Sequence, residues 1–175
     1  MNAKRNILLI GLPGCGKSTV GALAAERLGW AFSDMDETVE SIAGRTIKEL
    51  FADGEECFRD VETQACRLLA QRSRTVIAAG GGVVKREQNI ALLRPSCRIV
   101  FLDRRAQEIV RDVDTQTRPL LRQGAEQVFA LERERRPLYL AAAEQVLTGD
   151  LTPNEAAQMI CQWAKELESA REVIG

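Results

Sequence analysis

The sequence predicts an α/β fold of the doubly wound class, with helices on both faces of a mostly parallel sheet. Short apolar segments typical of buried strands alternate along the chain with segments whose apolar residues recur at helical spacing. This alternation favours a parallel sheet that is covered on both faces. Glycine-rich and acidic stretches follow several of the strands, and ligands bind at the carboxyl ends of the strands in such sheets.

The first strand and the first helix are the clearest elements. Residues 5–11 form an apolar run typical of a fully buried strand, and residues 17–28 place Val20, Leu23 and Leu28 at helical spacing. Further extended segments are expected over 30–34, 75–82, 98–103 and 144–149. Further helices are expected over 36–43, 46–52, 55–72, 87–93, 104–112, 125–136 and 153–169. The apolar face of the helix over 55–72 is expected to consist of Phe58, Val61, Ala65, Leu68 and Leu69.

The composition indicates one globular domain over residues 1–175. Of these residues 45% are apolar and 28% are charged, which is not the composition of a disordered chain. A net charge of −1 does not favour a general nucleic-acid binder, which normally has a strong basic excess. The apolar runs are far shorter than the ~18 residues that span a bilayer, and the N-terminal sequence has no signal-peptide pattern. A cytoplasmic protein without a membrane partner is therefore expected.

Cysteine and arginine usage narrows the possible chemistry. The five cysteines include no CxxC pair and the chain has no histidine, so we expect reduced thiols, mostly in the core, and no zinc site. Nineteen of the 24 basic residues are arginine, which is suited to bidentate recognition of carboxylates and phosphates. Most of these arginines are expected on solvated helix surfaces, and those near strand ends are candidates for anion binding.

A glycine-rich loop, GLPGCGKSTVG, follows the first predicted strand directly and opens the first predicted helix. From Gly11 to Ser18 it matches G-x-x-x-x-G-K-[ST], the phosphate-binding loop, in its required context. Glycines let backbone N–H groups converge on an anion, Lys17 neutralises terminal phosphates and the Ser18 hydroxyl can ligate Mg²⁺. Thr19 is either a helix hydroxyl or a second phosphate contact. The loop predicts a nucleoside triphosphate as ligand.

The stretch SDMDE places two carboxylates at the end of an extended segment. Alternate side chains of such a segment point the same way, so Asp34 and Asp36 can reach one space. Near a triphosphate, Asp34 could hold a metal through its water shell, and Asp36 could bind an acceptor hydroxyl and take its proton. A helix start with Asp34 or Asp36 as the N-cap is compatible with the same pattern.

Two arginine-bearing helices offer ligands for a small carboxylate. On the helix over 55–72, Arg59 and Glu62 lie on a different face from the apolar one, where an exposed ion pair is the ordinary explanation. In ERERRPLY, arginines that include Arg135 crowd a predicted helix end just before Pro137, where they would complement the helix dipole. If two arginines from separate elements converge, they would instead clamp a small carboxylate.

Two connections complete the pattern. Gly80, Gly81 and Gly82 stand at the end of a predicted strand, where the backbone can approach a ligand without side chains intervening. The polar segment 112–124 is long for a loop in a compact domain, and such loops are often functional lids. Closure of this lid would bring Arg118 to the phosphates and expel water, which is a competing acceptor.

The stretches GLPGCGKSTVG, DMD, FRDVE, GGG, RPLL and RPLY, in this order over nearly the whole chain, closely resemble the shikimate kinase family. The resemblance implies a P-loop kinase of the nucleoside-monophosphate-kinase type, with a five-stranded parallel sheet in the order 2-3-1-4-5 and a closing lid. It also implies Mg²⁺-dependent transfer of the γ-phosphate of ATP to the 3-hydroxyl of shikimate, in the pathway to chorismate and the aromatic amino acids. We expect a monomer.

The resemblance assigns a role to each candidate on the nucleotide side. The residues that would cradle ATP are Gly14, Cys15, Gly16, Lys17, Ser18 and Thr19. Ser18 would bind Mg²⁺ with help from Asp34. Lys17 and Arg118, the lid arginine, would stabilise charge on the migrating phosphoryl group, and Arg111 would lie against the adenine.

On the acceptor side, the resemblance implies that Asp36 binds the shikimate hydroxyls. Arg59 and Arg135 would hold the shikimate carboxylate, and Gly81 would give it a backbone contact. The chain departs from the family in two places: the loop TGDLTP lacks the basic residue that some relatives place near the adenine, and Asp112 stands where the family often has threonine.

Two other classes of function remain compatible with part of the pattern. A gluconate-type kinase or a nucleoside monophosphate kinase would share the loop and the lid, but a base-binding pocket would not call for an arginine pair around a carboxylate. A nucleotide-dependent switch that transfers nothing would have no use for Asp36.

Overall fold

The centre of the structure, a computed structural model that describes residues 4–112 and 121–172, is a parallel sheet of five strands. The strands are β1 (Asn6–Ile10), β2 (Ala31–Asp34), β3 (Thr75–Ala78), β4 (Cys97–Asp103) and β5 (Gln145–Thr148). Their order is β2-β3-β1-β4-β5, and Leu8 of β1 lies between Ile77 of β3 and Ile99 of β4. The expected fold class and the strand order 2-3-1-4-5 are thus confirmed.

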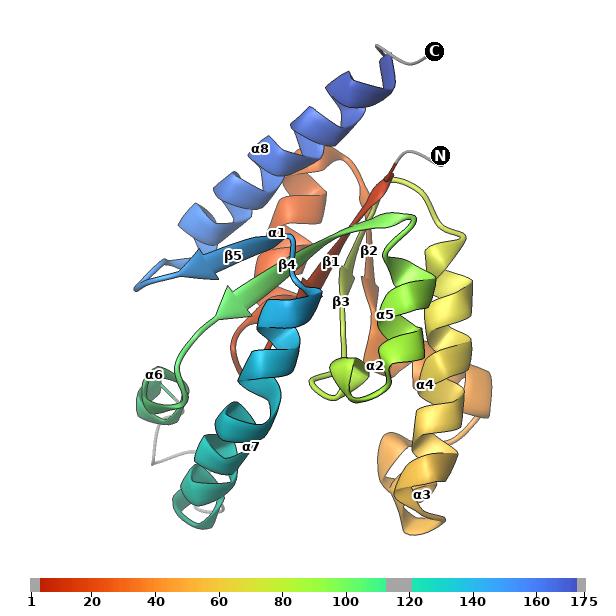
Figure 1. Ribbon diagram of the computed structural model, residues 1–175, viewed down its shortest axis with the longest axis vertical. Coiled ribbons are helices and arrows are strands. Elements are labelled where there is room, and N and C mark those ends of the chain that lie inside the picture. Colours follow the sequence, from red (N-terminus) through yellow and green to blue (C-terminus); the bar gives the residue numbers. More distant parts are fainter. Residues whose placement is uncertain (1–3, 113–120, 173–175) are drawn as a thin grey trace.

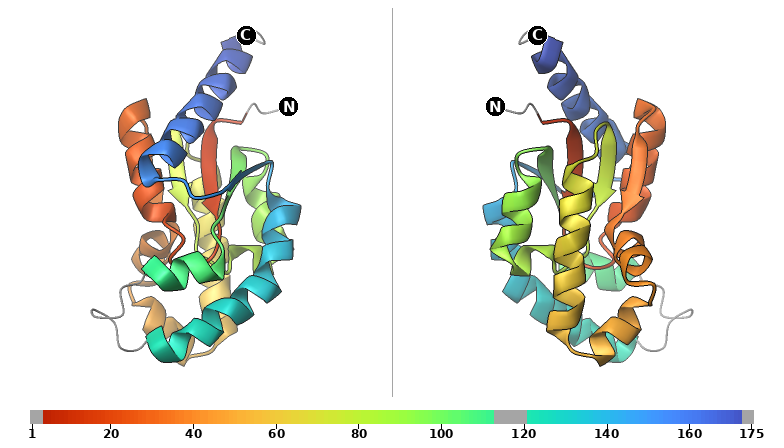
Figure 2. Two further views of the ribbon diagram at one scale, coloured as in Figure 1. Left: turned by 90° about the vertical axis from the view of Figure 1, so that its left-hand side faces the viewer. Right: turned by 90° about the vertical axis from the view of Figure 1, so that its right-hand side faces the viewer.

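Helices cover both faces of the sheet (Figures 1 and 2). One face carries α1 (Lys17–Leu28) and α8 (Pro153–Glu172), and the other carries α4 (Glu55–Ala70), α5 (Glu87–Leu93) and α7 (Leu121–Ala142). The shorter elements are α2 (Met35–Ala43), α3 (Ile47–Ala52), the 3-10 helix η1 (Val83–Lys85) and α6 (Ala106–Asp112). Within residues 4–112 and 121–172, the structure contains no helix both long enough and apolar enough to cross a bilayer.

The central strand β1 anchors the loop that follows it. All of its residues are buried, and Ile7 to Ile10 have no exposed surface. Each buried aliphatic side chain of this size contributes about 1.5–3 kcal/mol to folding. Because β1 is also paired on both edges, by β3 and β4, the glycine-rich loop begins from a firmly held central strand.

The cysteines are free thiols, as expected. Burial raises the pKa of Cys66 to about 12 and the pKa of Cys97 to about 11, so both stay neutral at physiological pH. Cys15, within the glycine-rich loop, is also buried.

Helix α7 differs from the sequence prediction at both ends. The predicted helix over 125–136 stops before Pro137, whereas α7 runs from Leu121 through Pro137 to Ala142. A proline inside a helix costs about 3 kcal/mol. That cost is offset because Tyr139 is fully buried, with its ring 5.1 Å from the ring of Phe101. The arginines of ERERRPLY therefore lie within a helix, and the prediction that they crowd a helix end was wrong.

The buried face of helix α4 overlaps the predicted one but is shifted toward Arg59 and Glu62. Phe58, Ala65 and Leu69 are buried as predicted, whereas Leu68 is exposed and the two charged residues are buried. The apolar positions alone could not reveal this shift, because the charged pair satisfies its hydrogen bonds inside the protein. The shift brings Arg59 toward the carboxyl ends of the strands.

Candidate active site

The glycine-rich loop connects β1 to the first turn of α1. Gly14 and Gly16 have φ angles of 79° and 99°, in the left-handed region that favours glycine. Gly16 is the residue before α1, so the unpaired N–H groups of the helix start face the loop. This conformation is compatible with the anion site that the motif predicts.

Lys17 lies back across the same loop. Its Nζ donates to the carbonyl oxygens of Gly11 and Leu12, each at 2.9 Å, and the side chain is buried. The Sγ of Cys15 lies 3.7 Å from the same Nζ. These contacts hold the ammonium charge at the loop, beside the N–H groups that would receive phosphate.

Asp34 links the loop to α2. The Ser18 hydroxyl donates to Asp34 Oδ2 at 2.7 Å, and the backbone N–H of Asp36 donates to Asp34 Oδ1 at 2.9 Å. Asp34 is therefore the N-cap of α2, one of the readings of SDMDE, and at the same time a neighbour of Ser18. A hydroxyl next to a carboxylate suits Mg²⁺, which binds one or two protein oxygens and keeps waters and phosphates as its other ligands.

Asp36 lies where α2 meets the glycine triplet. A Cβ added to Gly80 would be 2.9 Å from Asp36 Oδ1 and 3.3 Å from Glu62 Oε1. Burial raises the pKa of Asp36, and the neighbouring Asp34 carboxylate raises it further, whereas Lys17 opposes the shift. A carboxylate with a raised pKa holds a proton more readily, which suits a group that must take one from an alcohol.

The glycines of the triplet make room for three different neighbours. A Cβ at Gly80 would press on Asp36, and one at Gly81 would lie 2.8 Å from the ring of Pro13 in the phosphate-binding loop. A Cβ at Gly82 would overlap the guanidinium of Arg59. The triplet therefore lets α2, the phosphate-binding loop and α4 approach one backbone segment.

Arg59 is held by two carboxylates from its own helix. Its side chain is 6% exposed, and Nη1 donates to both oxygens of Glu62, at 3.0 and 2.8 Å. Nε and Nη2 both donate to Glu55 Oε1 at 3.2 Å. Burial raises the pKa of Glu62, and Arg59 opposes this shift. The ion pair between Arg59 and Glu62 that the sequence suggested is present, but it is buried rather than exposed.

On α7 the arginines have different surroundings. Arg136 donates to Asp103 at the end of β4 through Nε and Nη2, at 3.0 and 2.7 Å, which fastens the helix to the sheet. Arg133 is exposed. The Arg135 side chain is 13% exposed, and its Nε is buried without a hydrogen-bond partner among the residues that the structure describes. A buried donor of this kind is suited to an external acceptor.

Helices α4 and α7 both reach the triplet. Arg59 of α4 lies against Gly82, and Tyr139 of α7, one helical turn after Arg135, donates its hydroxyl proton to the carbonyl oxygen of Gly81. Lys85 of η1 lies between these helices, with its Nζ near Glu55 of α4 and Glu134 of α7. Tyr139 and Lys85 were not found from the sequence, because the predicted helix ended before Tyr139 and Lys85 follows no recognised motif.

One cavity of about 460 Å³ joins the predicted phosphate residues to two of the predicted acceptor residues, Asp36 and Gly81, whereas Arg59 and Arg135 are not among its lining residues. Its lining residues are Pro13, Gly14, Gly16, Lys17, Ser18, Thr19, Asp34, Asp36, Ala79 and Gly81. Thr19 thus faces the cavity, which leaves both of its predicted roles compatible with the structure. The arrangement allows a phosphate chain on the loop and an alcohol at Asp36 to share one space.

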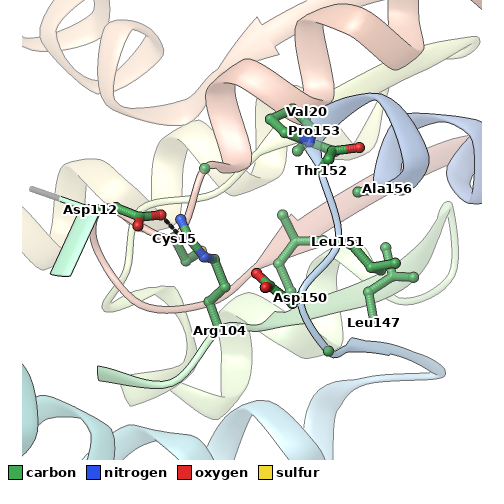
Figure 3. Close-up of a pocket in the computed structure, with 13 residues that line it drawn as sticks. Cys15, Val20, Arg104, Asp112, Leu147, Asp150, Leu151, Thr152, Pro153 and Ala156 are labelled. Atoms are coloured by element: carbon green, nitrogen blue, oxygen red, sulfur yellow. Dashed lines mark hydrogen bonds and ion pairs between the residues drawn. The ribbon is translucent and has the colours of Figure 1, made fainter. Parts of the chain in front are cut away.

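A neighbouring cavity of about 340 Å³ is lined in part by Cys15 and Gly16 of the phosphate-binding loop (Figure 3). One wall is the connection that contains Asp150 and Leu151, and the opposite side carries an ion pair between Arg104 and Asp112. Its apolar lining suits a flat nucleotide base. Arg104 was not found from the sequence, although its position one residue after β4 was the available signal.

The ion pair also gives a structural role to Asp112, which stands where the family that the sequence resembles often has threonine. Its carboxylate pairs with Arg104 at the end of α6. Arg111 is exposed and does not line this cavity within the described part of the chain. Arg118 and most of the predicted lid, residues 113–120, lie outside the described residues, and residues 121–124 of that predicted lid already belong to α7.

Comparison with known proteins shows the family to which the chain belongs. A model of the shikimate kinase family matches residues 13–165. A shikimate kinase from Clostridium beijerinckii is 46% identical over 147 residues, which cover 84% of this chain and 87% of that protein. A solved shikimate kinase from Acinetobacter baumannii in complex with shikimate has a TM-score of 0.82 at 32% identity, covering 94% of this chain and 95% of the other. A solved shikimate kinase from Aquifex aeolicus has a TM-score of 0.77 at 31% identity, covering 94% and 98%. This chain therefore belongs to the shikimate kinase family.

Proposed function

We propose that the cavity over the phosphate-binding loop transfers the γ-phosphate of ATP to the 3-hydroxyl of shikimate. ATP-dependent phosphorylation of shikimate, in the pathway to the aromatic amino acids, is the activity of the family to which the chain belongs. The observation that carries the assignment of roles is the single cavity lined by Lys17, Ser18, Asp36 and Gly81. The same cavity would receive the donor phosphates at one end and the acceptor alcohol at the other.

On the donor side, the loop N–H groups and Lys17 bind the phosphates. Charge on the transferred phosphoryl group is stabilised by donors that are already in place, which is the main contribution a kinase makes to this reaction. Ser18 and Asp34 would hold Mg²⁺, which when bound neutralises charge on the β- and γ-phosphates. Arg118 of the predicted lid supplies a further positive charge in this proposal, on the strength of the family motif alone.

On the acceptor side, Asp36 binds the 3-hydroxyl and takes its proton as the bond to phosphorus forms. Its carboxylate lies beside Gly80, where a side chain would collide with it, and the raised pKa keeps its basicity high. Because the chain has no histidine, a carboxylate is the natural base in this cavity.

The shikimate carboxylate binds between Arg59 and Arg135, with a backbone contact from Gly81. Arg59 offers a planar guanidinium fixed by Glu62, and Arg135 offers a buried Nε that has no hydrogen-bond partner among the described residues. Two positive groups around one carboxylate distinguish this acceptor from a nucleoside monophosphate, whose base needs no such pair.

We further propose that the enzyme acts as a cytoplasmic monomer without nucleic-acid partners. A net charge of −1 and five free cysteines support this part of the proposal.

An ADP-release assay tests the function. With ATP and Mg²⁺, shikimate should stimulate ADP release far above buffer, whereas quinate, gluconate and nucleoside monophosphates should stimulate it much less. Stimulation by gluconate or a nucleoside monophosphate instead of shikimate would assign the chain to another acceptor, and hydrolysis without any acceptor would favour a nucleotide switch. Asp36→Asn should abolish the shikimate response while ATP binding persists; unchanged turnover would remove Asp36 from the mechanism.

A further inference from the structure

We propose that Glu55 is an internal placeholder for the substrate carboxylate, which shikimate must displace from Arg59 onto Lys85. The inference rests on the proposed function, because it takes Arg59 as a ligand of the substrate carboxylate. It makes Glu55 and Lys85 positioning residues that set the affinity for the acceptor without touching the reacting atoms.

The hydrogen bonds of Arg59 show which part of its guanidinium a ligand can use. Nη1 is committed to Glu62, whose side chain is 1% exposed and also lies 3.4 Å from Asn89 Nδ2. The Gly82 backbone lies against the same guanidinium. The edge formed by Nε and Nη2 is therefore the one with two donors that a planar carboxylate could take. Glu55 Oε1 occupies both of these donors, at 3.2 Å.

Glu55 and Glu62 differ in their freedom to leave. Glu62 is enclosed between α4 and α5, whereas the Glu55 side chain is 47% exposed in the first turn of α4. Its contacts to Arg59 are also longer than its contact to Lys85, whose Nζ lies 2.6 Å from the same Oε1. Glu55 can therefore rotate away from Arg59 without losing its closest partner.

Lys85 is well placed to receive Glu55. It stands at the end of η1, three residues after Gly82, and its Nζ also lies 3.9 Å from Glu134 Oε1 on α7. Glu134 Oε1 in turn lies 3.9 Å from Arg135 Nε. Lys85 thus stands between the carboxylates that accompany the two arginines of the proposed clamp. The negative charge of a ligand in the clamp would be neutralised by Arg59, while the charge of Glu55 would stay paired with Lys85.

The placeholder has a measurable consequence for affinity and specificity. Shikimate binds only the fraction of molecules in which Glu55 has left Arg59, and its apparent affinity is reduced by that fraction. An uncharged analogue such as the methyl ester of shikimate cannot replace the charge of Glu55 on Arg59. The placeholder therefore adds to the discrimination against acceptors that lack a carboxylate.

The test compares Glu55→Gln with Glu56→Gln. Both variants remove one negative charge from the first turn of α4, but Glu56 is 84% exposed and pairs with Arg86 instead of Arg59. Glu55→Gln should lower the KM for shikimate, and its Kd by calorimetry without ATP, about two- to fivefold, as expected for a partly exposed ion pair. The kcat and the KM for ATP should stay within twofold, and Glu56→Gln should change none of these values.

Lys85→Met provides a second, independent test. Without Lys85, Glu55 keeps only Arg59 as a partner, so the KM for shikimate should rise about two- to fivefold. In the Glu55→Gln background the same change should have little effect, because Lys85 acts through Glu55 in this scheme. Equal effects of Lys85→Met in both backgrounds would mean that Lys85 attracts the substrate directly and would overturn the proposal.

The outcomes separate this inference from the proposed function. If the wild-type protein does not phosphorylate shikimate, or Arg59→Lys leaves shikimate binding unchanged, the proposed function or its carboxylate site fails. If the wild type is active and Arg59→Lys weakens binding, but Glu55→Gln raises the KM or leaves it unchanged, the placeholder alone is overturned.

Discussion

The residues proposed to bind phosphate come from one run, 11–19, whereas those proposed for the acceptor come from α2, the glycine triplet, α4 and α7. The loop is supported by a buried strand on one side and a helix start on the other, so its geometry is local. The proposed acceptor side forms only when elements far apart in sequence meet at Gly80, Gly81 and Gly82. The donor and acceptor sides should therefore respond differently to substitution.

The largest effect is expected from Lys17→Met in the phosphate-binding loop. Loss of the ammonium group removes charge stabilisation of the transferred phosphoryl group, and we expect kcat to fall by about a thousandfold. Shikimate binding without ATP, measured by calorimetry, should change far less, because the hydrogen bonds of Lys17 lie within the loop and its charge reaches Asp36 only through space. A comparable loss of shikimate affinity would show that the donor and acceptor sides are not independent.

Gly82→Ala tests the acceptor side, whose residues come from several elements. The φ of Gly82 is −102°, which alanine adopts freely, so the substitution acts through its contact with Arg59. Glu62 and Glu55 hold the guanidinium in the space that the methyl group would take, so the guanidinium would be displaced from the clamp. A shift of about 1 Å can lower the rate about a hundredfold. We expect kcat/KM for shikimate to fall by roughly that factor. The KM for ATP should change little.

The contrast also appears in pH dependence. The raised pKa of Asp36 means that its proton-accepting form is lost at a higher pH than for an ordinary aspartate, and is fully present above that pKa. As pH falls through this value, kcat/KM for shikimate should decrease about tenfold per unit. Calorimetric ATP binding over the same range serves as the control. An acid limb at or below the ordinary aspartate pKa would contradict the assignment of Asp36 as base.

The smallest effect is expected in the cavity beside the loop. Asp112→Asn removes a negative charge and releases Arg104, so the KM for ATP should fall about two- to threefold at low salt. Asp53→Asn breaks an exposed pair with Arg45 that joins the two ends of α3, and neither residue lines this cavity. It is the matched control and should leave this KM unchanged. A higher KM for Asp112→Asn would mean that the pair helps to shape the base site.

The same contrast explains what could be predicted from the sequence. The phosphate-binding loop was accessible, because its motif fixes residue types at adjacent positions directly after the apolar residues Ile7–Ile10 of β1. The strand order came from the family resemblance and not from the pattern of apolar residues. The N-cap role of Asp34 was also accessible, since capping is a local interaction.

The other features of the site depend on tertiary contacts, which the spacing of apolar residues along the sequence does not reveal. The burial of Arg59 depends on Glu62 and on the absence of a side chain at Gly82, so hydrophobicity placed it on the wrong face of α4. The second half of α7 depends on the pocket for Tyr139, which outweighs the usual effect of Pro137. The sequence resemblance named Arg59 and Arg135, but only the fold shows the carboxylates that accompany them.

The triplet has a consequence for how acceptor choice can evolve in this scaffold. Since a methyl group at position 80, 81 or 82 would strike a different neighbour in each case, none of the three positions is free to acquire a new recognition group. Substitutions that change the acceptor alcohol must then occur on α4 and α7. Longer side chains can be exchanged there while the backbone of the triplet between these helices is kept.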